Sequence, residues 1–339
     1  MEKKLNRRFI ILLIATAIFF VLIFATALMV GRYPIRVDDF FKAIFTNDET
    51  LEMQRSIVTK LRLPRTIMAG MVGIGLSLSG LLYQETFKNK LVSPDLLGVS
   101  TGASVGAALA IVLGLSSIFI SVFAFIAGVA TVILTVLVAR LFKNGSSMTL
   151  LLSGIIVGGL MSAILSIIKY LADPQTTLAS ITYWLMGSFE NATMSQSYIL
   201  VGIVGVCAIV LIVLSFRIYL VALGRQAAQT KGINYARYRY LIIGIATLLT
   251  AISVCFCGTI SWIGLVIPHI VRLTVGHNTK RTIPLCITFG GSFMILTDIL
   301  SRSFMDSELP LSAVTGLFGT VVFVIILIIR RRDIYEHQD

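Results

Sequence analysis

Long stretches of the chain contain no Asp, Glu, Lys or Arg, and these stretches constrain the fold more than any other feature. A helix needs about 20 consecutive apolar residues to cross a lipid bilayer. The composition agrees with such spans, because 57% of the residues are hydrophobic and only 13% are charged. The sequence therefore predicts an all-α, polytopic integral membrane protein with a single transmembrane domain over residues 1–339. The charge-free runs cover residues 9–31, 66–84, 96–139, 146–168, 191–216, 240–271, 282–297 and 309–329.

Two of these runs are too long for one span. The 44 residues of 96–139 must fold back once, and the small residues at 114–117 permit a turn there. The 32 residues of 240–271 are divided near 257–259. The second part is expected to be short and to end at Pro268, because proline removes a helix hydrogen bond. The sequence thus predicts about ten transmembrane helices.

The net charge of +12 suits either a nucleic-acid-binding protein or a membrane protein with basic inner loops. Counted along ten spans from an inner start, 19 of the 28 Lys and Arg residues fall on the inner side. Seven of the other nine lie in the outer segment 32–65, where five acidic residues accompany them. This asymmetry predicts that both termini are cytoplasmic, and it favours a membrane over a nucleic-acid partner.

The N-terminus also has features of a cleavable signal peptide. Basic residues precede the first apolar run, and Ala25-Thr26-Ala27 could serve as a small-residue cleavage motif. The apolar run of 23 residues is nevertheless longer than the stretch of about 7 to 15 that is typical of signal peptides. We therefore expect a retained first span.

The spans lack the side chains that catalysis and ion coupling usually need. Carboxylates and lysines occur only at the boundaries of the runs, as at Glu85, Asp95, Lys169 and Asp298, whereas ion-coupled carriers place such groups inside their spans. The chain has no glycine-rich phosphate loop ending in Gly-Lys-Ser or Gly-Lys-Thr, and its four cysteines and three histidines lack zinc-site spacing. We expect no enzymatic activity, metal or cofactor in this chain, and an energy source in another subunit. A stand-alone channel or secondary carrier is the alternative.

Two connections between the spans are informative. Residues 217–239 form the longest inner connection and carry five basic residues and no acid. Within it, Gly224 and Gly232 bracket a short predicted helix, which is either a docking element for a soluble partner or a basic anchor at the membrane surface. On the outer side, residues 38–45 form an amphipathic patch that predicts a helix, which either lies on the membrane surface or is a solvated connection.

The third span has a distinct start and a stripe of small residues. Ser93, Pro94 and Asp95 combine a capping hydroxyl, a proline suited to the first helical position and a carboxylate that favours the positive end of the helix dipole. A helix is therefore expected to start there. Glycines recur every four residues from Gly98 to Gly106, which indicates close helix packing or a substrate path.

Six ordered motifs resemble those of the FecCD family, the permeases of type II ABC importers for iron-siderophores, haem and cobalamin. The resemblance extends from the first span to the last. The matching motifs are RLPR at 62–65, SPDLLGVSTGA at 93–103, LLLSGIIVG at 150–158, WLMGSF at 184–189, GTISWIGLVIPHIVR at 258–272 and ELP at 308–310.

The resemblance implies a ten-helix permease subunit in a bacterial cytoplasmic membrane. Its implied partners are a second permease subunit, identical or paralogous, two ATP-binding cassette subunits that hold ATP and Mg, and an extracytoplasmic substrate-binding protein. The implied function is import of a ferric siderophore by alternating access, with haem or cobalamin as alternative substrates.

The resemblance also assigns roles to residues. In the family, outer arginines receive acidic side chains of the binding protein, the inner gate lies before the third and fifth spans, and the connection after the sixth span contacts the ATPase. Arg225 stands where family members often have an acidic residue. A partner chain of complementary charge would explain this difference. The matching positions are Arg62, Arg65 and Arg302 for docking, Asn89, Leu91, Ser146 and Ser147 for the gate, Leu223, Gly224, Arg225, Ala228 and Gly232 for coupling, and Pro268, His269 and Arg272 near the cytoplasmic face.

Overall fold

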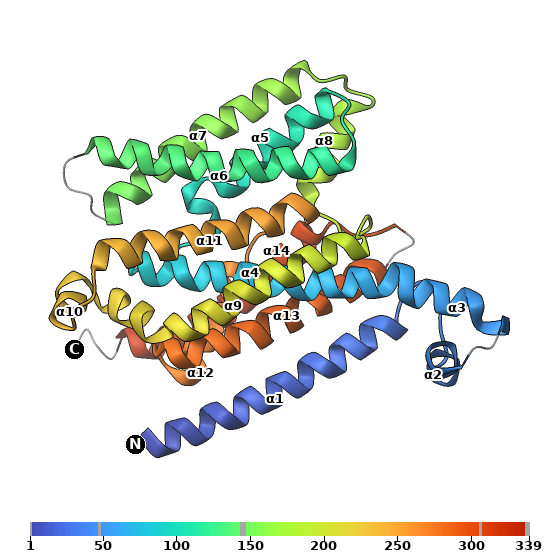
Figure 1. Ribbon diagram of the computed structural model, residues 1–339, viewed down its shortest axis with the longest axis horizontal. Coiled ribbons are helices and arrows are strands. Elements are labelled where there is room, and N and C mark those ends of the chain that lie inside the picture. Colours follow the sequence, from blue (N-terminus) through green and yellow to red (C-terminus); the bar gives the residue numbers. More distant parts are fainter. Residues whose placement is uncertain (1, 47–48, 143–146, 305–306, 336–339) are drawn as a thin grey trace.

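The computed structural model describes residues 2–46, 49–142, 147–304 and 307–335, and these residues form helices joined by short connections (Figure 1). Among these residues, seven helices are long and apolar enough to cross a membrane, and three shorter apolar helices bring the number to the ten that the sequence predicts. The long helices are α1 (Glu2–Met29), α4 (Leu63–Phe87), α6 (Ser117–Leu141), α7 (Ser147–Leu171), α9 (Met194–Leu223), α11 (Tyr235–Cys257) and α13 (Thr279–Ser303).

The remaining helices are shorter or, in the case of α14, have a shorter apolar part. Three of them complete the set of candidate spans, namely α5 (Val99–Val112), α12 (Ile263–Val275) and α14 (Leu311–Tyr335). The others form connections: α2 (Val37–Phe45), η1 (Glu49–Leu51), α3 (Glu52–Ser56), η2 (Ile57–Arg62), η3 (Pro94–Leu97), α8 (Thr177–Met186) and α10 (Arg225–Thr230). Helix α2 coincides with the amphipathic patch that the sequence predicts to be helical.

Helix α4 is the centre of the bundle. It packs against α9, α11, α12 and α13, and 89% of its most apolar stretch is buried, compared with 6% for α1. Helices α5 to α8 form a layer on one side of this centre, and α1 lies on the other side against α13 (Figure 1). Helix α4 is therefore in contact with most of the other long helices.

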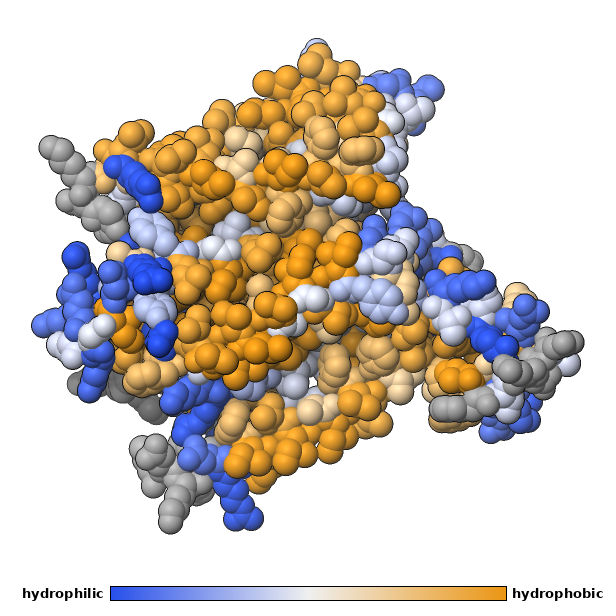
Figure 2. Space-filling model, viewed as in Figure 1, coloured by the Kyte–Doolittle hydropathy of each residue, from blue (hydrophilic) through white to orange (hydrophobic). Residues whose placement is uncertain are grey.

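The surface is arranged as a membrane protein requires. In Figure 2 an apolar belt covers the middle of the visible face, and hydrophilic residues gather at its two ends. One polar end holds α10 and the start of α1, and the other holds α2 and α3 (Figure 1). We call these the inner and the outer end, following the predicted topology.

The glycines of α5 allow close packing against α6. A Cβ atom on Gly102 would lie 2.0 Å from Thr131 Oγ1, and one on Gly106 would lie 2.3 Å from the carbonyl oxygen of Phe123. Since such distances are impossible for a real side chain, this stripe supports the packing interpretation for α5.

The start of the third span differs from the prediction. Pro94–Leu97 form only a 3₁₀ turn, Gly98 follows with a φ of 81°, and the α-helix begins at Val99. Ser93 makes no side-chain capping hydrogen bond to the described residues, and Asp95 instead accepts one from the Ser100 hydroxyl. The left-handed conformation of Gly98 breaks the helix that the capping motif would otherwise have started.

The expectation that the eighth span ends at Pro268 is wrong, because α12 continues to Val275. A proline at this position removes the hydrogen bond to the carbonyl four residues earlier, which belongs to Gly264. That carbonyl accepts a hydrogen bond of 3.1 Å from Gln84 Nε2 of α4. The side chain of a neighbouring helix thus satisfies the group that proline leaves without a partner.

The two informative connections are shorter than predicted. Helix α9 continues to Leu223 and α11 starts at Tyr235, so only residues 224–234 of the inner connection lie outside the long helices. On the outer side, helical structure runs without interruption from Glu52 to Phe87. Two charged residues of these extensions have partners there, since Arg217 donates to the Tyr238 hydroxyl and Arg55 to the carbonyl of Ala43.

Candidate functional site

The predicted coupling residues form a tight turn at the inner end, between α9 and α11. Helix α9 ends at Leu223, and Gly224 follows with a φ of 117° and a ψ of 177° that redirect the chain into α10. Gly232, with a φ of 71°, follows α10, and Asn234 then caps α11. The two glycines bracket a short helix as the sequence predicts, because both positions need the positive φ that glycine adopts without strain.

The coupling turn is joined to α4 by one side chain. Lys88, the residue that ends α4, donates a hydrogen bond of 2.9 Å from its Nζ to the carbonyl oxygen of Leu223. A Cβ atom on Gly224 would lie 2.3 Å from the same Nζ. The turn and the inner end of α4 are therefore in direct contact.

The five coupling residues divide into an outward and an inward group. Leu223 and Arg225 are exposed and available to a partner. Ala228 is 0% exposed, and its backbone holds the turn together, because its amide donates to the carbonyl of Gly224 and its carbonyl accepts from the amide of Ile233, both at 3.0 Å. Ala228 thus shapes the turn and does not face outward in this chain.

The predicted gate residues lie around the inner end of α4. Asn89 and Leu91 belong to the connection that follows Lys88, and Asn89 Oδ1 accepts a hydrogen bond of 3.0 Å from the amide of Leu91. Ser147 begins α7, and its hydroxyl donates to the carbonyl of Thr86 at 3.5 Å. The predicted gate residue Ser146 lies outside the described residues.

A polar contact that the sequence does not reveal joins α12 to α4 at the same end. Arg272 is 6% exposed, donates to the side-chain oxygen of Gln84 and pairs with Glu85 at 3.5 Å. In the sequence, Glu85 stands out only as an ionisable residue at the boundary of a run, and Arg272 only as the last residue of a motif. Their pairing depends on the packing of two helices that are far apart in the sequence.

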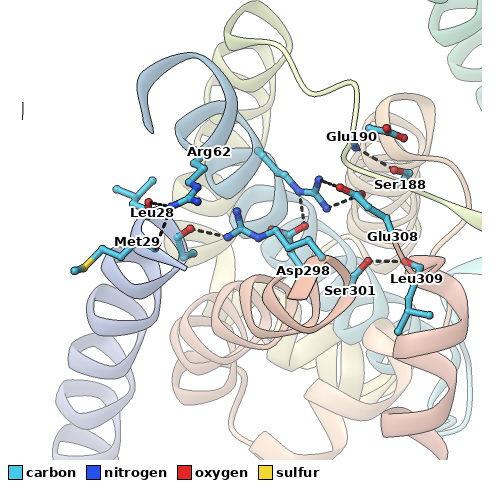
Figure 3. A network of polar contacts seen from close by, with 12 residues as sticks. Leu28, Met29, Arg62, Ser188, Glu190, Asp298, Ser301, Glu308 and Leu309 are labelled. Carbon is cyan, nitrogen blue, oxygen red and sulfur yellow. Dashed lines mark hydrogen bonds and ion pairs between the residues drawn. The ribbon is translucent and has the colours of Figure 1, made fainter. Parts of the chain in front are cut away.

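At the outer end, the three predicted docking arginines belong to a buried network (Figure 3). Arg65 Nε donates to Asp298 Oδ1 at 2.7 Å, and its two terminal nitrogens form a forked pair with Glu308 at 2.7 and 3.0 Å. Arg302 Nε lies 3.3 Å from Asp298 Oδ2. Asp298, which is 0% exposed, is therefore held between two guanidinium groups.

The same network reaches the outer end of α1 through backbone carbonyls. Arg62 donates to the carbonyl oxygens of Leu28 at 3.0 Å and Met29 at 2.6 Å, and Arg302 donates to that of Ala27 at 2.6 Å. The network thus ties α1, α4 and α13 together with the segment that carries Glu308 (Figure 3). Sequence reasoning identified the arginines but missed both carboxylates as their partners.

The docking prediction assumed accessible arginines, and on this point the structure differs. Arg62, Arg65 and Arg302 are 5%, 9% and 5% exposed, and each donates to a group of its own chain. These guanidinium groups hold helices together in this conformation. Docking to a binding protein stays a prediction, and it would require the internal contacts to open.

The side chains that commonly bind metals are scattered through the bundle. Within the described residues, no group of three or more His, Cys, Asp or Glu side chains could hold a metal ion. The four cysteines are buried and free, as expected for small apolar residues.

The comparisons with known proteins agree on one family. A model described as the FecCD transport family matches residues 18–330. The molybdate import system permease protein MolB of Haemophilus influenzae is 35% identical over 89% of this chain and 90% of that protein. A "Probable iron chelatin transport system permease protein" of Helicobacter pylori is 34% identical over 84% and 86%. The vitamin B12 import system permease protein BtuC of Citrobacter koseri is 32% identical over 81% and 84%.

Solved structures share the fold. One described as a metal-chelate type ABC transporter in an inward-facing conformation has a TM-score of 0.84 at 33% identity, over 93% of this chain and 98% of that chain. PsaBC from Streptococcus pneumoniae, in complex with Fab, has a TM-score of 0.58 at 17% identity, over 86% and 95%, and shows likeness of fold alone.

Proposed function

Because the chain belongs to the FecCD transport family, we propose that it moves a ferric siderophore across the bacterial cytoplasmic membrane by alternating access. The chain is a multi-pass membrane permease subunit of a bacterial ABC importer, and a separate subunit hydrolyses ATP. The observation that carries the mechanism is the contact between the coupling turn and the end of α4.

The contact suggests how ATP-driven movement reaches the gate. An ATPase subunit that pushes on the exposed Leu223 and Arg225 would displace the turn, and Lys88 would pass the displacement to the inner end of α4. Asn89 and Leu91 follow directly in the chain, and Ser147 touches α4 one turn earlier. The contact between Lys88 and Leu223 thus links the coupling turn to the segment that carries the gate residues.

The proposed complex has a second permease subunit, identical or paralogous, two ATPase subunits and an extracytoplasmic binding protein. Both termini of this chain would be cytoplasmic. The middle parts of the spans carry no charged side chain, which suits a path that passes a bulky chelate without binding it tightly. In this arrangement the binding protein supplies most of the specificity.

Among substrates, a metal chelate is favoured by the Helicobacter pylori permease named for iron chelatin and by the structural neighbour described as metal-chelate type. Molybdate is the second candidate, since the relative named for it is 35% identical over 89% of this chain. Cobalamin is the third, through the vitamin B12 permeases.

Uptake by the intact transporter tests the proposal. Cells that lack the permease and cells that carry it are supplied with radiolabelled ferric siderophore, molybdate or cobalamin. We expect accumulation of the ferric siderophore alone, and its loss when the ATPase subunit is inactivated. Accumulation of molybdate or cobalamin alone would overturn the siderophore assignment, and uptake that continues without the ATPase would contradict ATP-driven import.

A further inference from the structure

Two hollows of different character meet at Tyr240, near the start of α11. The first has a volume of ≈ 650 Å³ and lies at the inner end, between α7, α10 and α11. Its walls include the polar side chains of Arg225, Gln229, Arg239 and Ser147. We call it the basic pocket. Its volume falls in the range of small-molecule sites, which is about 300 to 1,000 Å³.

The basic pocket is suited to an anion. None of the described residues that line it is acidic, and it holds two guanidinium groups. Two long helices, α7 and α11, begin at its wall, so the positive ends of both helix dipoles point toward it. Arg239 is 8% exposed, so water screens its charge only weakly at the wall of the pocket.

The second hollow is an apolar groove of ≈ 410 Å³ between α6 and α11, two helices that pack side by side (Figure 1). It is lined by side chains such as Val132, Val136, Ile243 and Leu248, and Gly244 widens it. Both helices are membrane spans, so the groove lies at the depth of the lipid chains.

The two hollows adjoin at one residue. Tyr240 lines both of them. At the inner end of the groove, the guanidinium carbon of Arg140 lies 5.7 Å from the centre of the Tyr240 ring. A third positive charge therefore stands at the boundary between the apolar groove and the basic pocket.

We propose that the basic pocket and the groove together bind one anionic glycerophospholipid of the inner leaflet. Its phosphate lies against Arg225, Arg239 and Arg140, and one acyl chain fills the groove along α6 and α11. A free phosphate would use only the basic pocket, and a zwitterionic lipid would bring a cationic group to a site without a described acidic residue. Basic pockets between membrane helices on the cytoplasmic side bind such head groups in other proteins.

The site joins α6, α10 and α11 through one ligand. A bound lipid would brace the inner end of the layer formed by α5 to α8 against the coupling turn. The inference depends on the membrane setting and on these two hollows, and it holds for any substrate of the transporter.

Lipid binding to the purified full-length chain tests the proposal. Native mass spectrometry in detergent compares phosphatidylglycerol with phosphatidylcholine of the same acyl chains. We expect tighter binding of phosphatidylglycerol, weakened about fivefold by Arg225→Gln and again by Arg140→Gln, since each basic group contributes about 1 kcal/mol. Arg8→Gln, which removes an exposed inner charge elsewhere, serves as the charge-matched control.

The groove is tested separately by filling it. Gly244→Leu adds a side chain where no described atom lies within 4 Å, and Gly202→Leu makes the same change on α9, equally open but outside the site. We expect loss of phosphatidylglycerol binding from the first variant only.

Three results would overturn the proposal. The first is equal binding of the two lipids. The second is equal behaviour of Gly244→Leu and Gly202→Leu. The third is displacement of phosphatidylglycerol by inorganic phosphate at a concentration comparable to that of the lipid, which would identify the ligand as the free anion.

Discussion

The side-chain nitrogen of Lys88 donates a hydrogen bond of 2.9 Å to the carbonyl oxygen of Leu223, across 135 residues of sequence. The two residues end the helices α4 and α9, and the chain continues from one into the predicted gate and from the other into the predicted coupling turn. Lys88 itself has a φ of 53°, the left-handed conformation in which helices commonly end, and its amide donates to the carbonyl of Gln84.

Removing this contact should uncouple the ATPase from the gate. We expect Lys88→Met to lower substrate uptake several-fold in the reconstituted transporter, while the ATPase continues to hydrolyse ATP. A single partly exposed hydrogen bond contributes only about 1 kcal/mol to stability, so the protein should still fold. Lys42→Met, at the outer end, is the control. Equal uptake by both variants would contradict a role for Lys88 in coupling.

A substitution at Gly224 should be harmful, because both its backbone conformation and its surroundings disfavour a side chain. Its φ is 117°, and a Cβ atom there would lie 2.3 Å from Lys88 Nζ, so Gly224→Ala should strain the turn and displace Lys88. Gly232→Ala shares a positive φ, 71°, but has no described atom within 4 Å of the added carbon. The strained backbone costs about 1 to 3 kcal/mol in either variant.

Comparing the two glycine variants separates strain from contact. Thermal unfolding in detergent should show a loss of stability for both, whereas uptake should fall much further for Gly224→Ala. If uptake fell equally, backbone strain alone would account for the effect and the contact with Lys88 would be unimportant.

Asp298 should be the most sensitive position of the outer network. It is fully buried between Arg65 and Arg302, so Asp298→Asn removes the negative charge that balances them. Breaking a buried ion pair by removing one partner typically costs about 3 to 5 kcal/mol. Glu308→Gln changes a more exposed partner of Arg65 and should cost less. Thermal unfolding of the two variants checks this order, and a greater loss from Glu308→Gln would contradict it.

Individual residues show which features of the fold and the site can be predicted from the sequence. The apolar runs predicted the ten spans because a helix that crosses the lipid interior needs a continuous stretch of apolar residues. Gly224 and Gly232 were predicted to flank a short helix, and both adopt the positive φ angles that favour glycine. The partners of Arg65 could not be found, since Asp298 lies 233 residues away and only helix packing brings them together. Likewise, Pro268 signals a helix end in the sequence, but whether the helix continues depends on Gln84 in another helix.

Gln84 therefore gives the last prediction. Its Nε2 donates to the carbonyl of Gly264 at 3.1 Å and to that of Val92 at 3.2 Å, and its Oε1 accepts from Arg272. The variant Gln84→Leu fills a similar space but leaves two buried carbonyls and a buried guanidinium with fewer partners. Each unsatisfied group costs about 1 to 3 kcal/mol, so the midpoint of thermal unfolding should fall clearly.

The matched control for this variant is Gln226→Leu, which makes the same chemical change on the exposed face of α10. We expect its unfolding midpoint to stay close to that of the unmodified protein. Because α12 continues through Pro268 only where the carbonyl of Gly264 is satisfied, Gln84→Leu should also increase amide hydrogen exchange in residues 263–275. If exchange there stayed unchanged, Gln84 would not be what allows α12 to pass its proline.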